Sequence, residues 1–248
     1  MCTVSWIHRE DGYLLLFNRD ELRTRKPASA PRIEQRNGVA FIAPLDGDHG
    51  GSWIGVNQFG LTLCLLNRFD DLPGGIIHEY ASRGLLLHEL LDCSALKMVI
   101  ERVDDAKCFR FRPFTLVALV TGQPAMLIEW TGSEKITKTH AESLMPITSS
   151  SLREGNVVLE RKERFQEMVL ERSKVDDELL FQFHRSHLPE RGPASVCMHR
   201  PDARTVSMST VTVTQKAIEF VYHPNSPCQP AMADRLQLER TPSFLSQR

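Results

Sequence analysis

Cys2, the second residue of the chain, has the chemistry of an N-terminal nucleophile. It follows Met1, and an initiator methionine in front of a side chain as small as that of Cys is normally removed by processing. Removal leaves a residue with both a thiol and a free α-amine, whose unperturbed pKa values of about 8.5 and about 7.7–8.0 lie close together. The amine can then take the thiol proton near neutral pH. The alternative is a buried strand cysteine that packs as a small hydrophobic residue.

A polar run at positions 18–21, Asn-Arg-Asp-Glu, is expected to lie beside this cysteine. Residues 2–7 alternate as a half-buried strand does, and residues 13–17 have the pattern of a second strand. The Asp-Gly dipeptide at positions 11–12 is typical of a hairpin turn. The hairpin would therefore return the polar run to the N-terminus.

Two members of this run have types that suit a cysteine nucleophile. Arg19 would lower the thiol pKa through its positive charge and bind an anionic group of a substrate. Asp20 would hold the amine or the arginine in place. The alternative is a surface turn with a cluster of ion pairs.

A second candidate for chemistry is the Cys197-x-His199 pair, which invites a metal or haem site. On a strand the two side chains share one face, but no second cluster in the sequence completes a site. We therefore expect core packing for this pair, no metal and no organic cofactor. We likewise expect His187 to be structural or exposed. The six cysteines lack C-x-x-C spacing and are interpreted as reduced thiols.

The composition is that of a globular protein with one sizeable core. The chain has 248 residues, of which 42% are hydrophobic and 25% charged, and its net charge of -1 argues against nucleic-acid binding. No window approaches the roughly 20 apolar residues of a membrane span. The expected location is the cytoplasm, with a mitochondrial or other organelle left open. The oligomeric state is also open, a homo-oligomer included.

Strand patterns at both ends and in the middle, with helical patterns in two blocks, predict an α+β sandwich of two largely antiparallel sheets. The helical blocks cover residues 76–103 and 157–184. Residues 22–37 are expected to form a surface loop, and residues 194–198 a strand. We expect a single domain over residues 1–228, followed by a poorly ordered tail over 229–248.

Three sequence blocks carry a resemblance to a known family. They are residues 1–3, residues 18–21, and residues 50–57 followed by Gly60. This pattern resembles the NRDE family, which includes the transport and Golgi organisation protein 2 group. It is more distantly similar to cysteine N-terminal nucleophile (Ntn) amidohydrolases such as bile-salt hydrolase, penicillin V acylase and the acyltransferase that builds penicillins. The resemblance implies a four-layer αββα fold, with Cys2 as the nucleophile and its own α-amine as the base.

The resemblance also implies roles for residues near Cys2. Arg19 resembles the arginine beside the nucleophile in the bile-salt hydrolase group. Asp20 resembles the carboxylate near the thiol, but it follows Arg19 directly, whereas two residues intervene in that group. The carboxylate role therefore stays open between Asp20 and Glu21.

Later blocks suggest three further site residues by the same resemblance. Asn67 falls where an oxyanion-hole side chain is supplied, although it could equally be a turn residue. Ser150 lies in a run, residues 148–151, where the amidases have a Thr-Asn pair, so a serine hydroxyl would have to replace the asparagine. Arg204 is the match for a late active-site arginine.

The leading hypothesis is a hydrolase or acyltransferase that acts on a linear amide or acyl bond of a small molecule through Cys2. A rival from another class is a non-catalytic carrier in haem or lipid trafficking or in Golgi and membrane organisation, as the transport and Golgi organisation protein 2 group implies. A third is a scaffold that uses its C-terminal tail to bind partners.

Overall fold

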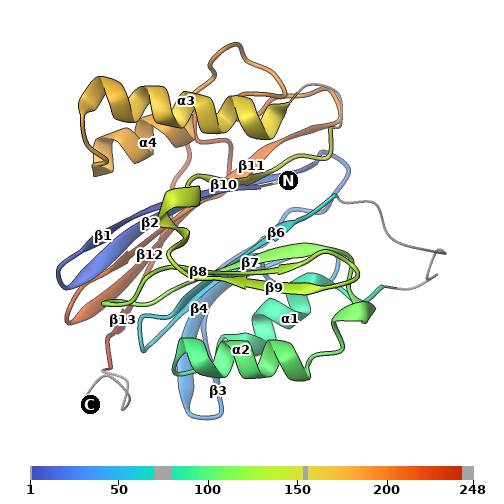
Figure 1. Ribbon diagram of the computed structural model, residues 1–248, viewed down its shortest axis with the longest axis vertical. Coiled ribbons are helices and arrows are strands. Elements are labelled where there is room, and N and C mark those ends of the chain that lie inside the picture. Colours follow the sequence, from blue (N-terminus) through green and yellow to red (C-terminus); the bar gives the residue numbers. More distant parts are fainter. Residues whose placement is uncertain (1, 70–79, 153–155, 242–248) are drawn as a thin grey trace.

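The computed structural model describes residues 2–69, 80–152 and 156–241. Two antiparallel sheets pack face to face, and helices cover the outer face of each sheet (Figure 1). This arrangement confirms the expected α+β fold with four layers, α-β-β-α.

The first sheet carries the N-terminus. Its strands, in spatial order, are β10 (Ile147–Ser149), β1 (Cys2–Arg9), β2 (Gly12–Leu22), β11 (Ala203–Val213), β12 (Ala217–His223) and β13 (Asp234–Glu239). The second sheet follows the chain order and consists of β3 (Ser29–Arg36), β4 (Val39–Leu45), β5 (Ile54–Asn57), β6 (Thr62–Asn67), β7 (Phe114–Leu119), β8 (Met126–Trp130) and β9 (Lys135–Lys138).

Two pairs of helices form the outer layers. The second sheet is covered by α1 (Arg83–Leu90) and α2 (Leu96–Asp105), and the first by α3 (Val157–Arg172) and α4 (Asp177–Arg185). Short 3-10 helices span Cys108–Arg110 and Ala141–Leu144. Among the described helices, none combines the length and the hydrophobicity that a membrane crossing requires.

The first hairpin has the predicted strands, and its side chains alternate between two environments. Val4 and Trp6 of β1 enter the core between the sheets, whereas Thr3 and Ser5 face the layer of α3 and α4. Because successive side chains of a strand point to opposite faces, apolar and small polar residues can alternate on a strand that is buried on both sides. This alternation fixes the register that brings the polar run beside Cys2.

The outer helix layers are fixed by apolar stripes and by caps. Phe165 of α3 and Phe183 of α4 pack on the first sheet, with ring centroids 4.9 Å apart. Asp176 caps α4 by accepting the Leu179 N–H at 2.9 Å. Ser173 follows α3 as its C-cap in the left-handed conformation.

Three expectations about local structure need correction. Within residues 22–37, Ser29–Arg36 forms edge strand β3, where a proline is tolerated because no described strand pairs with its outer side. Residues 194–198 are irregular rather than a strand. Within the expected tail over 229–248, Asp234–Glu239 forms β13, because its two leucines pack against the core between the sheets. Residues 70–79 and 242–248 lie outside the described residues.

Candidate active site

Cys2 begins β1 and is paired on both sides. It lies opposite Arg19 of β2 and opposite Ser149 of β10. Only 6% of the residue is exposed, and this part faces a pocket of about 380 Å³, here called the Cys2 pocket. The lining of the Cys2 pocket includes Cys2, Arg19, Asp46, Asn67, Arg83 and Arg112. The predicted nucleophile therefore opens onto a space that can hold a small molecule.

Opposing effects act on the Cys2 thiol. Burial raises its pKa, and the negative charge of Asp20 adds to this effect. A backbone hydrogen bond from Asp20 and the positive charge of Arg19 lower the pKa in turn. The net shift is upward, so this thiol needs a nearby base to become a thiolate at neutral pH.

The nitrogen of Cys2 has a defined acceptor. In the unprocessed chain this atom is a backbone N–H, and it donates to Ser149 Oγ at 3.1 Å. It would be the α-amine once Met1 is removed, a residue that lies outside the described part of the chain. The hydroxyl beside the nitrogen thus belongs to Ser149. Ser150, the predicted replacement for the amidase asparagine, accepts the Leu152 N–H through its Oγ at 3.1 Å.

Arg19 is held rigidly in the wall of the Cys2 pocket. Its Nη2 lies 2.5 Å from Asp46 Oδ2 and 3.4 Å from Glu21 Oε2. The guanidinium carbon also lies 3.9 Å from the centroid of the Trp53 ring, which is a cation–π geometry. Glu21 therefore pairs with Arg19 in the wall of the Cys2 pocket.

Asp20 makes its contacts on the other face of the sheet. Its Oδ1 accepts a hydrogen bond from Thr205 Oγ1 at 2.6 Å, and Arg161 Nη1 lies 3.3 Å from its Oδ2. All three side chains are buried. The backbone of Asp20 thus forms a hydrogen bond with the Cys2 sulfur, and its carboxylate belongs to a buried polar network on the opposite face of the sheet.

Arg161 is a site-supporting residue that the sequence reasoning missed. From α3 it donates to Thr3 Oγ1 at 2.9 Å, to Thr148 Oγ1 at 3.2 Å and to the Ser195 carbonyl at 2.8 Å. It occupies the same helix face as the buried residues of α3, with Phe165 one turn later. An arginine within an apolar helical stripe is a signal that could have identified it, because a buried charge needs a partner.

Arg83 and Arg112 form a second basic group in the Cys2 pocket. Burial lowers the pKa of Arg83 to about 10, and the nearby positive charge of Arg112 acts in the same direction. Arg83 Nη1 donates to the Pro113 carbonyl at 2.8 Å, and Arg112 lies over the Tyr80 ring. Within the described residues no carboxylate forms an ion pair with either arginine, so this wall suits an anionic ligand.

Of the other predicted site residues, Asn67 and Ser150 line pockets, whereas Arg204 does not line either of the two pockets described here. Asn67 ends β6 and lines both the Cys2 pocket and a neighbouring pocket of about 470 Å³, which Ser149 and Ser150 also line. Arg204 lies outside the lining of both pockets in the described part of the chain. It faces Glu21 across the β2–β11 ladder. The structure therefore brings Cys2, Arg19, Asp20 and Asn67 together and leaves Arg204 apart.

A comparison with protein-family models matches residues 1–219 to the family described as Transport and Golgi organisation 2. A search of curated proteins found no significant match.

Solved structures of similar fold are N-terminal nucleophile hydrolases. A Caenorhabditis elegans N-acylethanolamine-hydrolyzing acid amidase ortholog has a TM-score of 0.61 and 12% identity, over 85% of this chain and 92% of that one. Penicillin V acylase from Agrobacterium tumefaciens has a TM-score of 0.56 and 10% identity, over 96% and 86%. The C2A mutant of conjugated bile acid hydrolase from Clostridium perfringens has a TM-score of 0.55 and 12% identity, over 100% and 94%. These likenesses establish the fold.

Proposed function

This chain belongs to the Transport and Golgi organisation 2 family, and we propose that it is an N-terminal nucleophile hydrolase or acyltransferase that cleaves a linear amide or acyl bond through Cys2. The observation that carries the proposal is the pairing of Cys2 with Arg19 and Ser149 at the wall of the Cys2 pocket. The Cys2 nitrogen already has its acceptor, Ser149 Oγ, at 3.1 Å. A free α-amine at this position would be oriented beside its own thiol.

The reaction follows from the groups in place. The α-amine of Cys2 takes the thiol proton, and the sulfur attacks the carbonyl carbon of the substrate. Asn67 donates its side-chain N–H to the oxyanion, a kind of contact worth about 2.7–4 kcal/mol where one such donor has been removed. The carbon–nitrogen bond breaks as the α-ammonium protonates the leaving amine. Water, or an acceptor amine in a transferase, then attacks the thioester and releases the thiol.

The basic wall of the pocket indicates the kind of substrate. Arg83 and Arg112 lie in the same pocket as Cys2 and have no carboxylate partner in the described residues. Their charges would bind a carboxylate or another anionic group of an amide or acyl substrate. The substrate class is therefore a small acyl or amide compound with an anionic end.

The test is an acyl-adduct screen by intact mass spectrometry, with paired amides and thioesters that differ only in a terminal carboxylate. Native protein without Met1 should gain an acyl group on the peptide that begins with Cys2, and Cys2→Ala should gain none. Cys108→Ser serves as the matched control because this half-buried thiol lies outside the pocket. Retention of Met1 in native protein, or adducts that persist in Cys2→Ala, would overturn the proposal.

A variant of the basic wall tests the substrate class. Arg83→Met should raise the KM for the carboxylate-bearing member of a pair by about 10–100-fold, the value of a charge-assisted hydrogen bond, and leave the neutral member unchanged. Arg235→Met, on exposed β13 with Glu219 as its partner, is the control. Equal effects on both members would contradict the anionic substrate class while leaving Cys2 chemistry standing.

Family membership supports a second candidate function, a non-catalytic carrier in haem or lipid trafficking or in Golgi and membrane organisation. In a carrier the same pocket would hold a ligand without cleaving it. Ligand that co-purifies with Cys2→Ala as well as with the native chain supports the carrier. Ligand turnover that disappears in Cys2→Ala supports the enzyme.

A further inference from the structure

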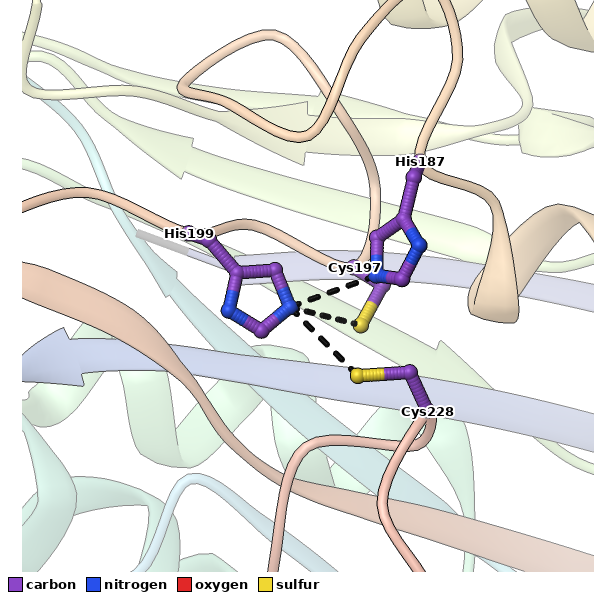
Figure 2. A group of neighbouring side chains, drawn as sticks. All are labelled: His187, Cys197, His199 and Cys228. Carbon is purple, nitrogen blue, oxygen red and sulfur yellow. Dashed lines mark hydrogen bonds between the residues drawn. The ribbon is translucent and has the colours of Figure 1, made fainter.

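Four potential metal ligands converge at a place away from the Cys2 pocket. They are His187, Cys197, His199 and Cys228, and one ligand atom from each lies within 4.8 Å of all the others. His187 follows α4, Cys197 and His199 precede β11, and Cys228 follows β12. Figure 2 shows the ring nitrogens and both sulfurs turned toward one another. Two connections of the chain, the one between α4 and β11 and the one between β12 and β13, therefore place donor atoms around one point.

Hydrogen bonding alone does not account for this convergence. His199 Nε2 lies 3.3 Å from His187 Nε2, 3.6 Å from Cys197 Sγ and 3.4 Å from Cys228 Sγ (Figure 2). A ring nitrogen carries either one hydrogen or one lone pair, so it makes one good hydrogen bond. Three polar partners around one nitrogen instead fit a cation that all four atoms share.

The three distances from His199 Nε2 match those of a tetrahedral zinc site, and all four ligand atoms lie within 4.8 Å of one another. Zinc–nitrogen bonds of about 2.05 Å and zinc–sulfur bonds of about 2.3 Å at tetrahedral angles separate two nitrogens by about 3.3 Å and a nitrogen from a sulfur by about 3.6 Å. The three distances from His199 Nε2 lie within about 0.2 Å of these values. The donor set of two thiols and two imidazoles is also the one that favours zinc over magnesium or calcium.

We propose that His187, Cys197, His199 and Cys228 bind one zinc ion as a structural site. Binding would release the two thiol protons to solvent, and the two thiolates would then balance the charge of Zn²⁺. Four protein ligands leave no open position for substrate, which is the property of a structural rather than a catalytic zinc site. The Cys197-x-His199 pair is thus completed by residues without motif spacing.

The zinc site would stabilise the buried hydrogen-bond network of Arg161 and Asp20 next to Cys2. The segment that leads to Cys197 supplies the Ala194 and Ser195 carbonyls that hold Arg161. Arg161 in turn holds Asp20. Fixing Cys197 to His187, which follows α4, and to Cys228 after β12 would therefore limit movement of this support. Zinc would stabilise the fold and the site together, without touching a substrate.

The test uses the full chain, purified under reducing conditions and depleted with a chelator, and zinc alone as the probe. Native protein should take up one zinc ion per chain, and the ion should raise its thermal unfolding midpoint. Cys228→Ser, a change at an exposed residue, should weaken zinc binding on the order of 100-fold or more, because changing a group that merely orients a ligand already costs about 10–100-fold. Cobalt in place of zinc should give sulfur-to-cobalt charge-transfer absorption.

A control variant and a labelling experiment on the native chain complete the test. Cys108→Ser lies outside the cluster and should bind zinc as the native chain does. Zinc should also slow the labelling of Cys228 by a thiol reagent in the native chain, a result that needs no variant. The proposal is overturned if reduced native protein takes up no zinc, if Cys228→Ser and His187→Ala both retain it fully, or if Cys197 and Cys228 are found joined by a disulfide in protein alkylated at lysis.

Discussion

Arg161 Nη1 lies 3.3 Å from Asp20 Oδ2, and the two buried residues are 141 positions apart in the chain. The pair connects α3 to β2, the strand that flanks Cys2. A buried charge without its partner is costly, so this contact couples the stability of the fold to the position of Asp20, whose backbone contacts the Cys2 sulfur.

Arg161→Met is therefore expected to lower the free energy of unfolding by about 3–5 kcal/mol, because it removes the buried cation that faces the Asp20 carboxylate. Urea unfolding measures this change. Arg164→Met on the same helix removes a partly exposed pair with Glu167 and should cost under about 1 kcal/mol. Equal losses in the two variants would contradict a special role for the buried pair.

Two threonines of β11 provide a matched comparison. Thr205 Oγ1 donates to Asp20 Oδ1 at 2.6 Å and accepts the Met198 N–H at 2.8 Å, so Thr205→Val should cost about 1–3 kcal/mol. Thr210 Oγ1 is buried, and the described residues offer it no hydrogen-bond partner. Thr210→Val should accordingly be neutral or stabilising. Chemical unfolding measures the stability of both variants. A larger loss in Thr210→Val than in Thr205→Val would refute the assigned hydrogen bonds.

His184 makes stability depend on pH. Burial lowers its pKa to about 3, and the positive charge of Arg161 acts in the same direction. Below the unfolded value of about 6.5 the unfolded chain binds a proton that the folded chain does not, so stability falls by about 1.4 kcal/mol per pH unit as the pH drops toward 3. Between pH 6.5 and 5 this effect amounts to about 2 kcal/mol of folding stability, and His184→Gln should abolish that part of the decrease.

Urea midpoints at pH 7 and pH 5 check this expectation. His140→Gln replaces an exposed histidine and should leave the loss at pH 5 unchanged. If the native chain and His184→Gln lose the same stability on acidification, His184 is not the titrating group.

Gly51 permits a close approach of two backbone segments that line the Cys2 pocket. A Cβ atom there would lie 2.4 Å from the carbonyl carbon of Gly84, and the Ser52 N–H donates to the Gly84 oxygen at 3.0 Å. Gly51→Ala should therefore cost about 1–3 kcal/mol in thermal unfolding. Gly192→Ala, whose Cβ would meet its nearest atom at 3.7 Å, is the control and should unfold nearly as the native chain does.

The sequence was sufficient to predict the features that depend on local pattern. The hairpin of β1 and β2 follows from alternation and an Asp-Gly turn, and its register then places Arg19 opposite Cys2. The two helix blocks and the four layers also follow from pattern and resemblance. Asn67 was placed at the pocket by resemblance alone.

Features that depend on contacts between distant segments could not be predicted in this way. Arg161 reaches Asp20 from a helix 141 positions away, and no local pattern states which strand that helix will cover. The contact of Ser149 with the Cys2 nitrogen depends on strand register, because a one-residue change of register exchanges the faces of a strand. His187 and Cys228 join Cys197 and His199 only through tertiary packing, so their spacing carried no signal.

The pairing of Cys2 with strands on both sides sets an order of events during synthesis. Its partner in β2 is made only 17 residues later, but its partner in β10, Ser149, is made 147 residues later. At about 5–20 residues per second, that delay lasts roughly 7–30 s on the ribosome. Removal of Met1 within this interval would meet an open strand edge, whereas later removal would have to reach a nitrogen already bonded in the sheet. Exposure of the Cys2 α-amine, which the proposed function requires, is thus expected to be an early, co-translational event.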